Sequence, residues 1–363
     1  MPTSPTPRCS GLVLLLAAGA LGGCVDLPGQ DKPKASKPVP RQPAGATTPT
    51  TQAAPDRVTA SATRERALQT IEELAVGGDP QTRANAVEAA SFAPTRLADV
   101  IAKGLRDANP AVRSVAAQCV GRTKLTDLAG EVSPLLTDPT PHVRLSAIYA
   151  QIALGQDADR TPLASALLEN PSPWVRRHAA FILGELGDPS AISLLRAALR
   201  DPYPTASAEQ VRALQLQIAE AMAKLGDANS RQVLRAALYP SRPEELEAAA
   251  LAVQILGEIQ DRDAIDQLIY LAEYRDRTGQ PYPAEVRLGI AAALAGMGLP
   301  QGRFIADEFA KHENPVLRAQ AAFVYGRIGG RESWERLAEL LNDPNPAVRV
   351  SAAAGILRSS ANR

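Results

Sequence analysis

The residue types that most often carry chemistry are sparse in this chain and widely spaced. Its three histidines, His142, His178 and His312, lie in distant parts of the sequence, and only His312 is followed directly by a glutamate. There is no His-Glu-x-x-His zinc motif, no Gly-x-Ser-x-Gly nucleophile motif and no glycine-rich phosphate loop. The sequence therefore predicts that the chain is not an enzyme and that it holds no metal or cofactor.

Aromatic and cationic side chains recur at positions that suit the binding of a protein or peptide. The fifth residue after the repeated arginine is Tyr149, Phe181 or Phe323 in three places. Arg177 and His178 share the helix face of Phe181. Exposed aromatics beside cations favour a binding groove. The alternative is that these side chains only pack neighbouring helices together.

Two insertions in the middle of the chain, 201–209 and 273–285, form a second candidate site. They contain Tyr203, Tyr274, Arg275 and Tyr282. Tyrosine and arginine are frequent anchors at interfaces, so we expect both insertions to emerge at one edge of the fold and to bind a partner. The alternative is that they are tolerated surface loops, because loops accept extra residues at little cost.

A short phrase that recurs through the chain sets these positions. Asp107-Ala-Asn-Pro-Ala-Val-Arg113 returns as Asn170-Pro-Ser-Pro-Trp-Val-Arg176 and as Asp343-Pro-Asn-Pro-Ala-Val-Arg349. Arginines 113, 144 and 176, and then 287, 318 and 349, follow one another at steps of 31 or 32 residues. A fixed period of this length is typical of a solenoid. Asp or Asn with Pro ends one helix and caps the next, so we expect about nine helical pairs and no sheet.

The first of these pairs, from Ala62 to about Phe92, has a shortened turn and is expected to cap the N-terminal end of the solenoid. The repeated arginines are expected to be structural. A guanidinium bridges several acceptors, so each arginine can join the acidic turns of adjacent repeats as one step of a ladder.

At these residues the chain resembles the HEAT-repeat family, in particular the short HEAT-like repeats first described in phycobilin lyases. The pattern Asp-Pro-x-x-x-Val-Arg-x-x-Ala-Ala-x-x-Leu-Gly-x-Leu-Gly-Asp fits Asn170 to Asp188 almost completely. The resemblance covers 61–363 and implies an all-α solenoid, but it is unspecific for function. HEAT-like deoxyhypusine hydroxylases hold two irons with several His-Glu pairs, and only His312-Glu313 matches. HEAT-like DNA glycosylases need a basic groove, which a chain of net charge +0 does not fit.

The first 60 residues predict where the protein resides. Arg8 precedes an apolar run from Gly11 to Leu21 that is too short to span a membrane, so residues 1–23 are predicted to be a signal peptide. Leu21-Gly22-Gly23-Cys24 resembles the lipobox of bacterial lipoproteins, which implies that Cys24 is lipidated. Residues 24–60 are rich in Pro, Thr and Ala and are expected to form a disordered tether. Val25 after the cysteine favours the outer membrane, facing the periplasm.

Together these features predict a non-catalytic, membrane-anchored scaffold of the bacterial cell envelope. Its partner would be a protein or peptide, and not nucleic acid. The alternative is an accessory lipoprotein that holds a ligand or glycan in a closed pocket among Tyr203, Tyr274 and Tyr282. Cys119, the one cysteine of the predicted solenoid, is expected to be a small core residue.

Overall fold

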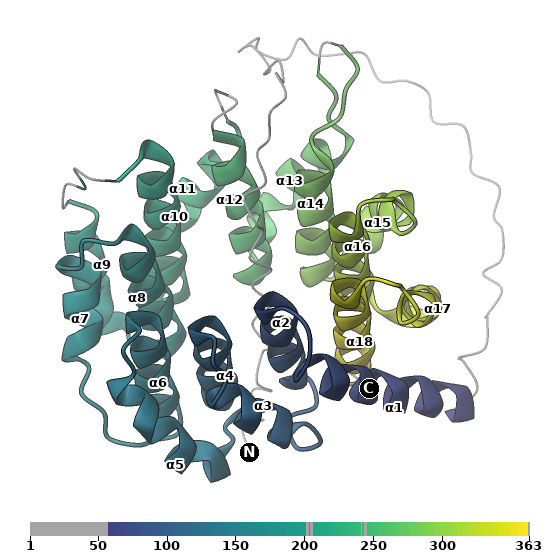
Figure 1. Ribbon diagram of the computed structural model, residues 1–363. Helices are drawn as coiled ribbons and strands as arrows, with labels where there is room; N and C mark the ends of the chain where they lie inside the picture. Colours follow the sequence, from purple (N-terminus) through teal and green to yellow (C-terminus); the bar gives the residue numbers. More distant parts are fainter. Residues whose placement is uncertain are drawn as a thin grey trace, which may run out of the picture.

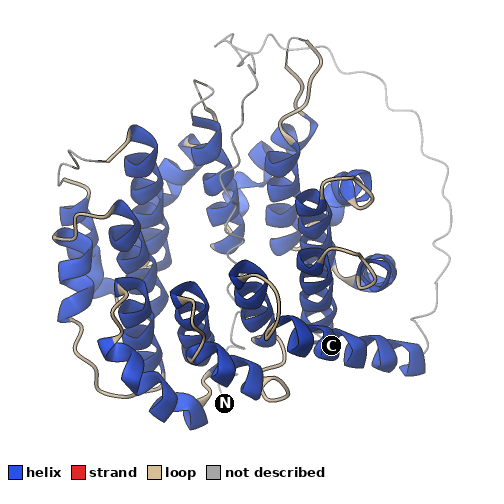
Figure 2. Ribbon diagram, in the orientation of Figure 1, coloured by secondary structure: helices blue, strands red, loops and turns tan. Residues whose placement is uncertain are grey.

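A computed structural model describes residues 57–361, except 201–202, 204–205, 241, 243–244 and 277. Residues 1–56, with the predicted signal peptide, Cys24 and most of the predicted tether, lie outside the described residues. Within the described part, all regular structure is helical apart from one isolated bridge between Arg275 and Pro281 (Figure 2). None of these helices is both long and apolar enough to cross a bilayer. The prediction of an all-α fold is confirmed.

The described helices form nine pairs, each with an outer helix followed by an inner one, which is the predicted number. The outer helices are α1 (Arg57–Leu74), α3 (Ala98–Leu105), α5 (Ala129–Val132), α7 (Thr161–Leu168), α9 (Ile192–Ala198), α11 (Ala228–Ala236), α13 (Ile265–Glu273), α15 (Arg303–Phe309) and α17 (Gly330–Leu340). The inner helices are α2 (Pro80–Ala90), α4 (Pro110–Thr123), α6 (Pro141–Ala153), α8 (Pro173–Leu186), α10 (Ala208–Lys224), α12 (Leu246–Glu258), α14 (Ala284–Gly296), α16 (Pro315–Ile328) and α18 (Pro346–Ala361).

The recurring turn phrase starts the inner helices through its own side chains. Before α4, Asn109 accepts a hydrogen bond from the amide of Ala111 at 2.9 Å, and Pro110 takes the first helical position. Proline suits that position because the amide it lacks would have no partner inside the helix. Asp107 accepts a hydrogen bond from the amide of Asn109 at 2.8 Å, and Asp343 accepts one from the amide of Asn345 before α18. The predicted role of the acidic turn residue is confirmed.

Several of the repeated arginines form the predicted ladder between neighbouring repeats. Arg113 donates through Nε to Asp138 at 2.9 Å and through Nη1 to the carbonyl of Asp107 at 2.8 Å. Arg318 donates through Nε to Asp343 at 2.7 Å in the same way. Arg113 and Arg318 each hold their own turn and the next one, which fixes the rotation between those repeats. Arg144 and Arg349, in contrast, donate to backbone carbonyls of their own turns.

The two ends of the solenoid meet. Helix α18 packs against both α1 and α2, and each inner helix packs against the next, so the inner helices close into a ring (Figure 1). Arg66 of α1 donates a hydrogen bond to Asn342, in the turn before α18. Ala67 and Ile71 of α1 are fully buried in the same apolar core as Ile356 of α18. The prediction of a terminal cap is therefore wrong, because the first and last pairs cover each other.

Small residues bring the inner helices unusually close. A Cβ atom on Gly326 would lie 2.6 Å from Cα of Gly355, and one on Gly257 would lie 2.7 Å from Cα of Ala293. Real Cβ contacts essentially never come this close, so only glycine permits these approaches. The inner face of the ring is consequently tight, and side chains that would be exposed on a single repeat are partly covered by their neighbours.

A candidate functional site on the inner face

The predicted aromatic groove is not open at its first residue. Tyr149 is only 6% exposed, because its ring covers Gly121 of the preceding inner helix, where a Cβ would lie 2.6 Å from the ring. Phe181 is half-buried, with Nζ of Lys224 5.3 Å from its ring centre. The expectation that Tyr149 is an exposed aromatic is wrong, since the closed ring holds adjacent helices closer than an isolated repeat suggests.

The predicted cations of this groove are also engaged in packing. Arg177 donates through Nε to Gln217 at 3.3 Å, and its guanidinium lies 5.7 Å from the centre of the exposed Trp174 ring. His178 Nε2 is 3.0 Å from the hydroxyl of Ser146, which lies 2.8 Å from the hydroxyl of Ser114. These hydrogen bonds link three successive inner helices. Ser146 is fully buried, so its hydrogen bond with His178 holds neighbouring inner helices together.

His178 should make the stability of the ring depend on pH. Burial, and then the neighbouring His142, lower the pKa of His178 to about 3, whereas an unfolded histidine titrates near 6.5. A depressed histidine pKa means that the folded state favours the neutral imidazole. The contribution of His178 to the free energy of unfolding is therefore complete above about pH 6.5 and is lost as the pH falls toward 3. We expect a loss of about 2 kcal/mol between pH 7 and pH 5, measured by urea unfolding. His178→Gln should flatten this slope and His312→Gln should keep it. An equal slope in wild type and His178→Gln would contradict this expectation.

The tyrosines of the two insertions do not share one site. The hydroxyl of Tyr203 donates to the carbonyl of Ala198, and the guanidinium of Arg176 lies 4.8 Å from its ring centre. Tyr203 packs on the apolar cluster of α6 to α10, while Tyr274 and Tyr282 belong to the other cluster. The structure therefore does not bring together the three tyrosines of the predicted closed pocket.

The second insertion is a short hairpin that leads into α14. Tyr282 is only 7% exposed, and its ring centre lies 5.1 Å from that of Tyr274, which in turn lies 6.0 Å from that of Tyr270. Arg275 forms the isolated bridge with Pro281, and its Nη1 donates to the carbonyl of Gly279 within the turn. The aromatic rings at the two ends of the hairpin thus pack against each other just before α14.

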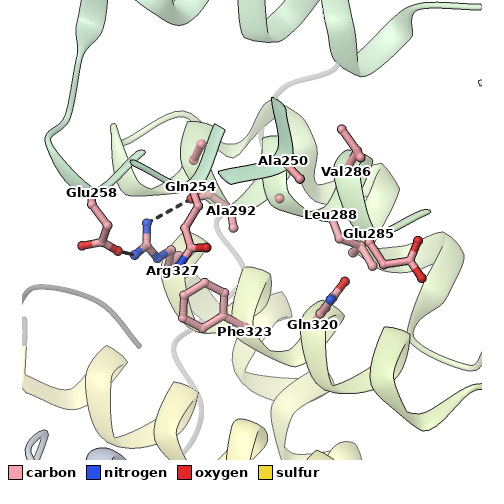
Figure 3. Close-up of a pocket in the computed structure, with 12 residues that line it drawn as sticks. Ala250, Gln254, Glu258, Glu285, Val286, Leu288, Ala292, Gln320, Phe323 and Arg327 are labelled. Atoms are coloured by element: carbon pink, nitrogen blue, oxygen red, sulfur yellow. Dashed lines mark hydrogen bonds and ion pairs between the residues drawn. The ribbon is translucent and has the colours of Figure 1, made fainter. Parts of the chain in front are cut away.

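A cavity of about 60 Å³ lies on the inner face between α12, α14 and α16 (Figure 3). Its aliphatic floor includes Ala250, Gly289 and Ala292. Phe323, a predicted partner-binding residue, also lines the cavity, so this one aromatic position lies at the site. The remaining lining residues are Gln254, Glu258, Glu285, Val286, Leu288, Ala293, Gln320 and Arg327.

Arg327 closes one end of the cavity (Figure 3). Its guanidinium forms an ion pair with Glu258 of α12 and lies 4.8 Å from the ring centre of Phe323. Its Nη1 is 3.4 Å from the carbonyl oxygen of Ala292 on α14. Arg327 therefore ties three inner helices together, and its positive charge is balanced by Glu258.

Two further polar groups of the cavity, the side-chain oxygen of Gln320 and the carboxylate of Glu285, have no partner among the described residues. Gln320 is 7% exposed, and its buried side-chain oxygen accepts no hydrogen bond from any described residue. A buried acceptor without a donor costs about 1–3 kcal/mol. Glu285, in the first turn of α14, has no ion-pair partner in the described part of the chain. With Arg327 and Glu258 balanced, Glu285 leaves the lining with one negative charge.

The sequence contains a signal for this site in the small residues of α14. At the inner-face positions where α8 has His178 and Phe181, α14 has Gly289 and Ala292. The aromatic residues of the other repeats predicted a site at those repeats. The cavity lies instead where one repeat lacks them, because missing side-chain volume leaves space between helices that are otherwise closely packed.

Comparison with known proteins agrees with this architecture. Residues 97–169 and 160–252 match a family model described as HEAT repeats. Residues 97–252 of this chain are therefore HEAT repeats. Among solved structures, this chain aligns with human deoxyhypusine hydroxylase in complex with glycerol at 19% identity and a TM-score of 0.32. The alignment covers 84% of this chain and 99% of that one. An engineered protein aligns at 19% identity and a TM-score of 0.33, over 55% of this chain and 95% of that one. At these TM-scores neither structure supports an argument about function.

A curated relative corrects the functional prediction. The chain is 28% identical to deoxyhypusine hydroxylase-B of Oryza sativa subsp. japonica over 228 residues, which are 57% of this chain and 74% of that protein. The relative is an enzyme, so the predictions of a non-catalytic scaffold and of no enzyme activity are contradicted. Those predictions relied on missing motifs of known metal and nucleophile sites, and such motifs do not report on other chemistry that the same ring can host.

The residues present do not fit the two-iron centre that the hydroxylase resemblance implies. The described residues contain no group of three or more His, Cys, Asp or Glu side chains that could hold a metal ion. His312-Glu313 lies in the turn before α16, where Nδ1 of His312 accepts from the amide of Asn314 at 3.0 Å. His142 and His178 are neighbours, with ring centres 5.1 Å apart, but their hydrogen bonds go to serine and to backbone carbonyls.

Proposed function

We propose that the inner-face cavity is the substrate site of an enzyme and that it receives the amine end of a lysine-like side chain. The observation that carries the proposal is the buried, unpartnered oxygen of Gln320 beside an aliphatic floor. An ammonium group supplies the hydrogen that this oxygen lacks, and its methylene stem covers Gly289 and Ala292. The charge of Glu285 balances the cation. The curated relative is by name an enzyme for deoxyhypusine, which is itself an amino acid with an amine at the end of a long side chain.

The substrate is proposed to be part of a peptide or protein. A cavity of about 60 Å³ holds roughly four to six water-sized groups, so it takes the end of a side chain and leaves the main chain outside. The sequence carries a formal net charge of +0, which gives no electrostatic attraction for nucleic acid.

The binding step can be tested with a matched pair of probes. Nα-acetyl-lysine N-methylamide should bind with a Kd of about millimolar, as expected for so small a buried group, measured by NMR titration. The norleucine analogue keeps the stem but lacks the amine and should bind at least tenfold more weakly. Glu285→Gln and Gln320→Leu should each weaken lysine-probe binding about tenfold, or about 1.4 kcal/mol. Glu313→Gln, which removes an exposed carboxylate in an outer turn, is the control. Equal binding of the two probes would contradict the proposed recognition of the amine.

We also propose that the protein is a lipoprotein of the bacterial envelope, anchored at the outer membrane through Cys24. The support is the Leu21-Gly22-Gly23-Cys24 sequence after a short apolar run. Cys24→Ser should move the protein from the membrane fraction to the soluble fraction, and the acyl mass should disappear from its N-terminal peptide in mass spectrometry. Cys119→Ser, which changes a buried core cysteine, should leave the acyl mass in place. A wild-type N-terminus without lipid would contradict the anchor.

A further inference from the structure

The packing of the ring does not explain Gly289. Within the described inner helices, six other glycines stand where an added Cβ would come within 2.6–2.8 Å of a neighbouring atom: Gly121, Gly184, Gly257, Gly296, Gly326 and Gly355. A Cβ on Gly289 would meet only a methyl group of Val253, at 3.7 Å, which is an ordinary van der Waals distance. Alanine would therefore fit at this position without moving any neighbour.

Gly289 also has no conformational reason to be glycine. It lies in the middle of α14, and its φ is not in the left-handed region. Glycine inside a helix is less favourable than alanine by about 1 kcal/mol. The fold alone would therefore favour alanine here. The side of Gly289 that lacks a neighbour is the side that lines the cavity.

Ala292, three residues later on the same helix face, also lines the cavity. The corresponding inner-face residues of α8 and α16 are Phe181 and Phe323. The phenyl ring of Phe181 is covered by Lys224 and that of Phe323 by Arg327. The closed solenoid therefore accommodates large side chains at this level. Gly289 is thus smaller than the packing requires, and Ala292 is smaller than the corresponding residues of α8 and α16.

We infer that Gly289 and Ala292 are specificity-determining residues, which keep the cavity floor open for an unbranched aliphatic stem. The inference rests on the proposed amine site and adds what that site selects. A four-carbon chain with its nitrogen matches roughly the four to six water-sized groups that the cavity holds. A branched or aromatic stem is too wide for a floor bounded by α12 and α16.

The test compares n-butylamine with benzylamine by NMR titration, using wild type and cavity-filling variants. Wild type should bind n-butylamine at least tenfold more tightly than benzylamine. Gly289→Ala should raise the melting temperature by about 2 °C and weaken n-butylamine binding at least tenfold. Ala292→Leu is a second filling variant with the same expected loss of binding. Gly130→Ala, in the exposed helix α5, is the control, which should leave binding unchanged.

The outcomes separate the inference from the proposal on which it rests. If Gly289→Ala binds n-butylamine as wild type does, or if it lowers the melting temperature, the role of Gly289 is overturned while the amine site stands. If wild type binds n-butylamine and benzylamine equally, the selection of an unbranched stem is overturned. If wild type binds neither amine nor the lysine probe, the proposed function fails, and the inference fails with it.

Discussion

Gly326→Val should prevent the ring from closing and should cost more than about 3 kcal/mol of stability. The new Cβ would lie 2.6 Å from Cα of Gly355, and a backbone atom cannot turn aside as a flexible side chain can. Helices α16 and α18 would have to separate. Because α18 is also the helix that meets α1 and α2, the strain would be passed directly to the contact between the two ends of the chain.

Thermal unfolding followed by circular dichroism measures the cost, and small-angle X-ray scattering measures the opening as a larger radius of gyration. The control is Gly130→Val, since a Cβ on Gly130 meets nothing within 4 Å. If Gly326→Val melts with the wild type and keeps its radius, the close approach of α16 and α18 would be contradicted.

Lys224→Met should destabilise the protein by about 3–5 kcal/mol, as removal of one partner from a buried ion pair does. The Nζ atom of Lys224 lies 2.7 Å from Glu185 and 2.5 Å from Glu220. The side chains of both glutamates are only 8% exposed, and that of Lys224 is 19% exposed. Burial works against the charge of Lys224, but the two carboxylates raise its pKa above the usual lysine value. Without the ammonium, two nearly buried negative charges would face each other.

Urea unfolding of a mutant series distinguishes this charge effect from lost packing. The triple variant Lys224→Met, Glu185→Gln, Glu220→Gln should regain most of the lost stability, because neutral amides tolerate burial together better than two carboxylates do. Arg336→Met, which removes an exposed cation paired with Glu339, should cost less than about 1 kcal/mol. If Lys224→Met costs no more than Arg336→Met, the buried pairing is not an important contributor.

Much of the fold follows from local sequence. The Asp, Asn and Pro residues of each turn fix where one helix ends and the next begins, and they do so through hydrogen bonds that span only two residues, as at Asp107 and Asn109. The ladder arginines follow from the same phrase. Closure of the ring does not. It depends on a small rotation per repeat accumulated over nine pairs, and no short phrase records that sum.

The candidate site was harder to predict for a related physical reason. The pattern of a single helix predicts an exposed Tyr149, but Gly121 of the preceding inner helix lies beneath its ring. The cavity beside Gly289 depends on residues from three helices at once. Small side chains on one helix become informative only when the large ones around them are known, and the sequence alone does not place those neighbours.

The meeting of α1 and α18 changes what the order of the repeats along the chain means. In an open solenoid the first and last repeats each have one bare flank, and fraying begins there. In a closed ring every repeat has two neighbours, so no repeat is terminal in space and the break in the backbone is only one position on a cycle. The fold should therefore tolerate circular permutation, with new chain ends placed in an outer turn and α18 linked to α1.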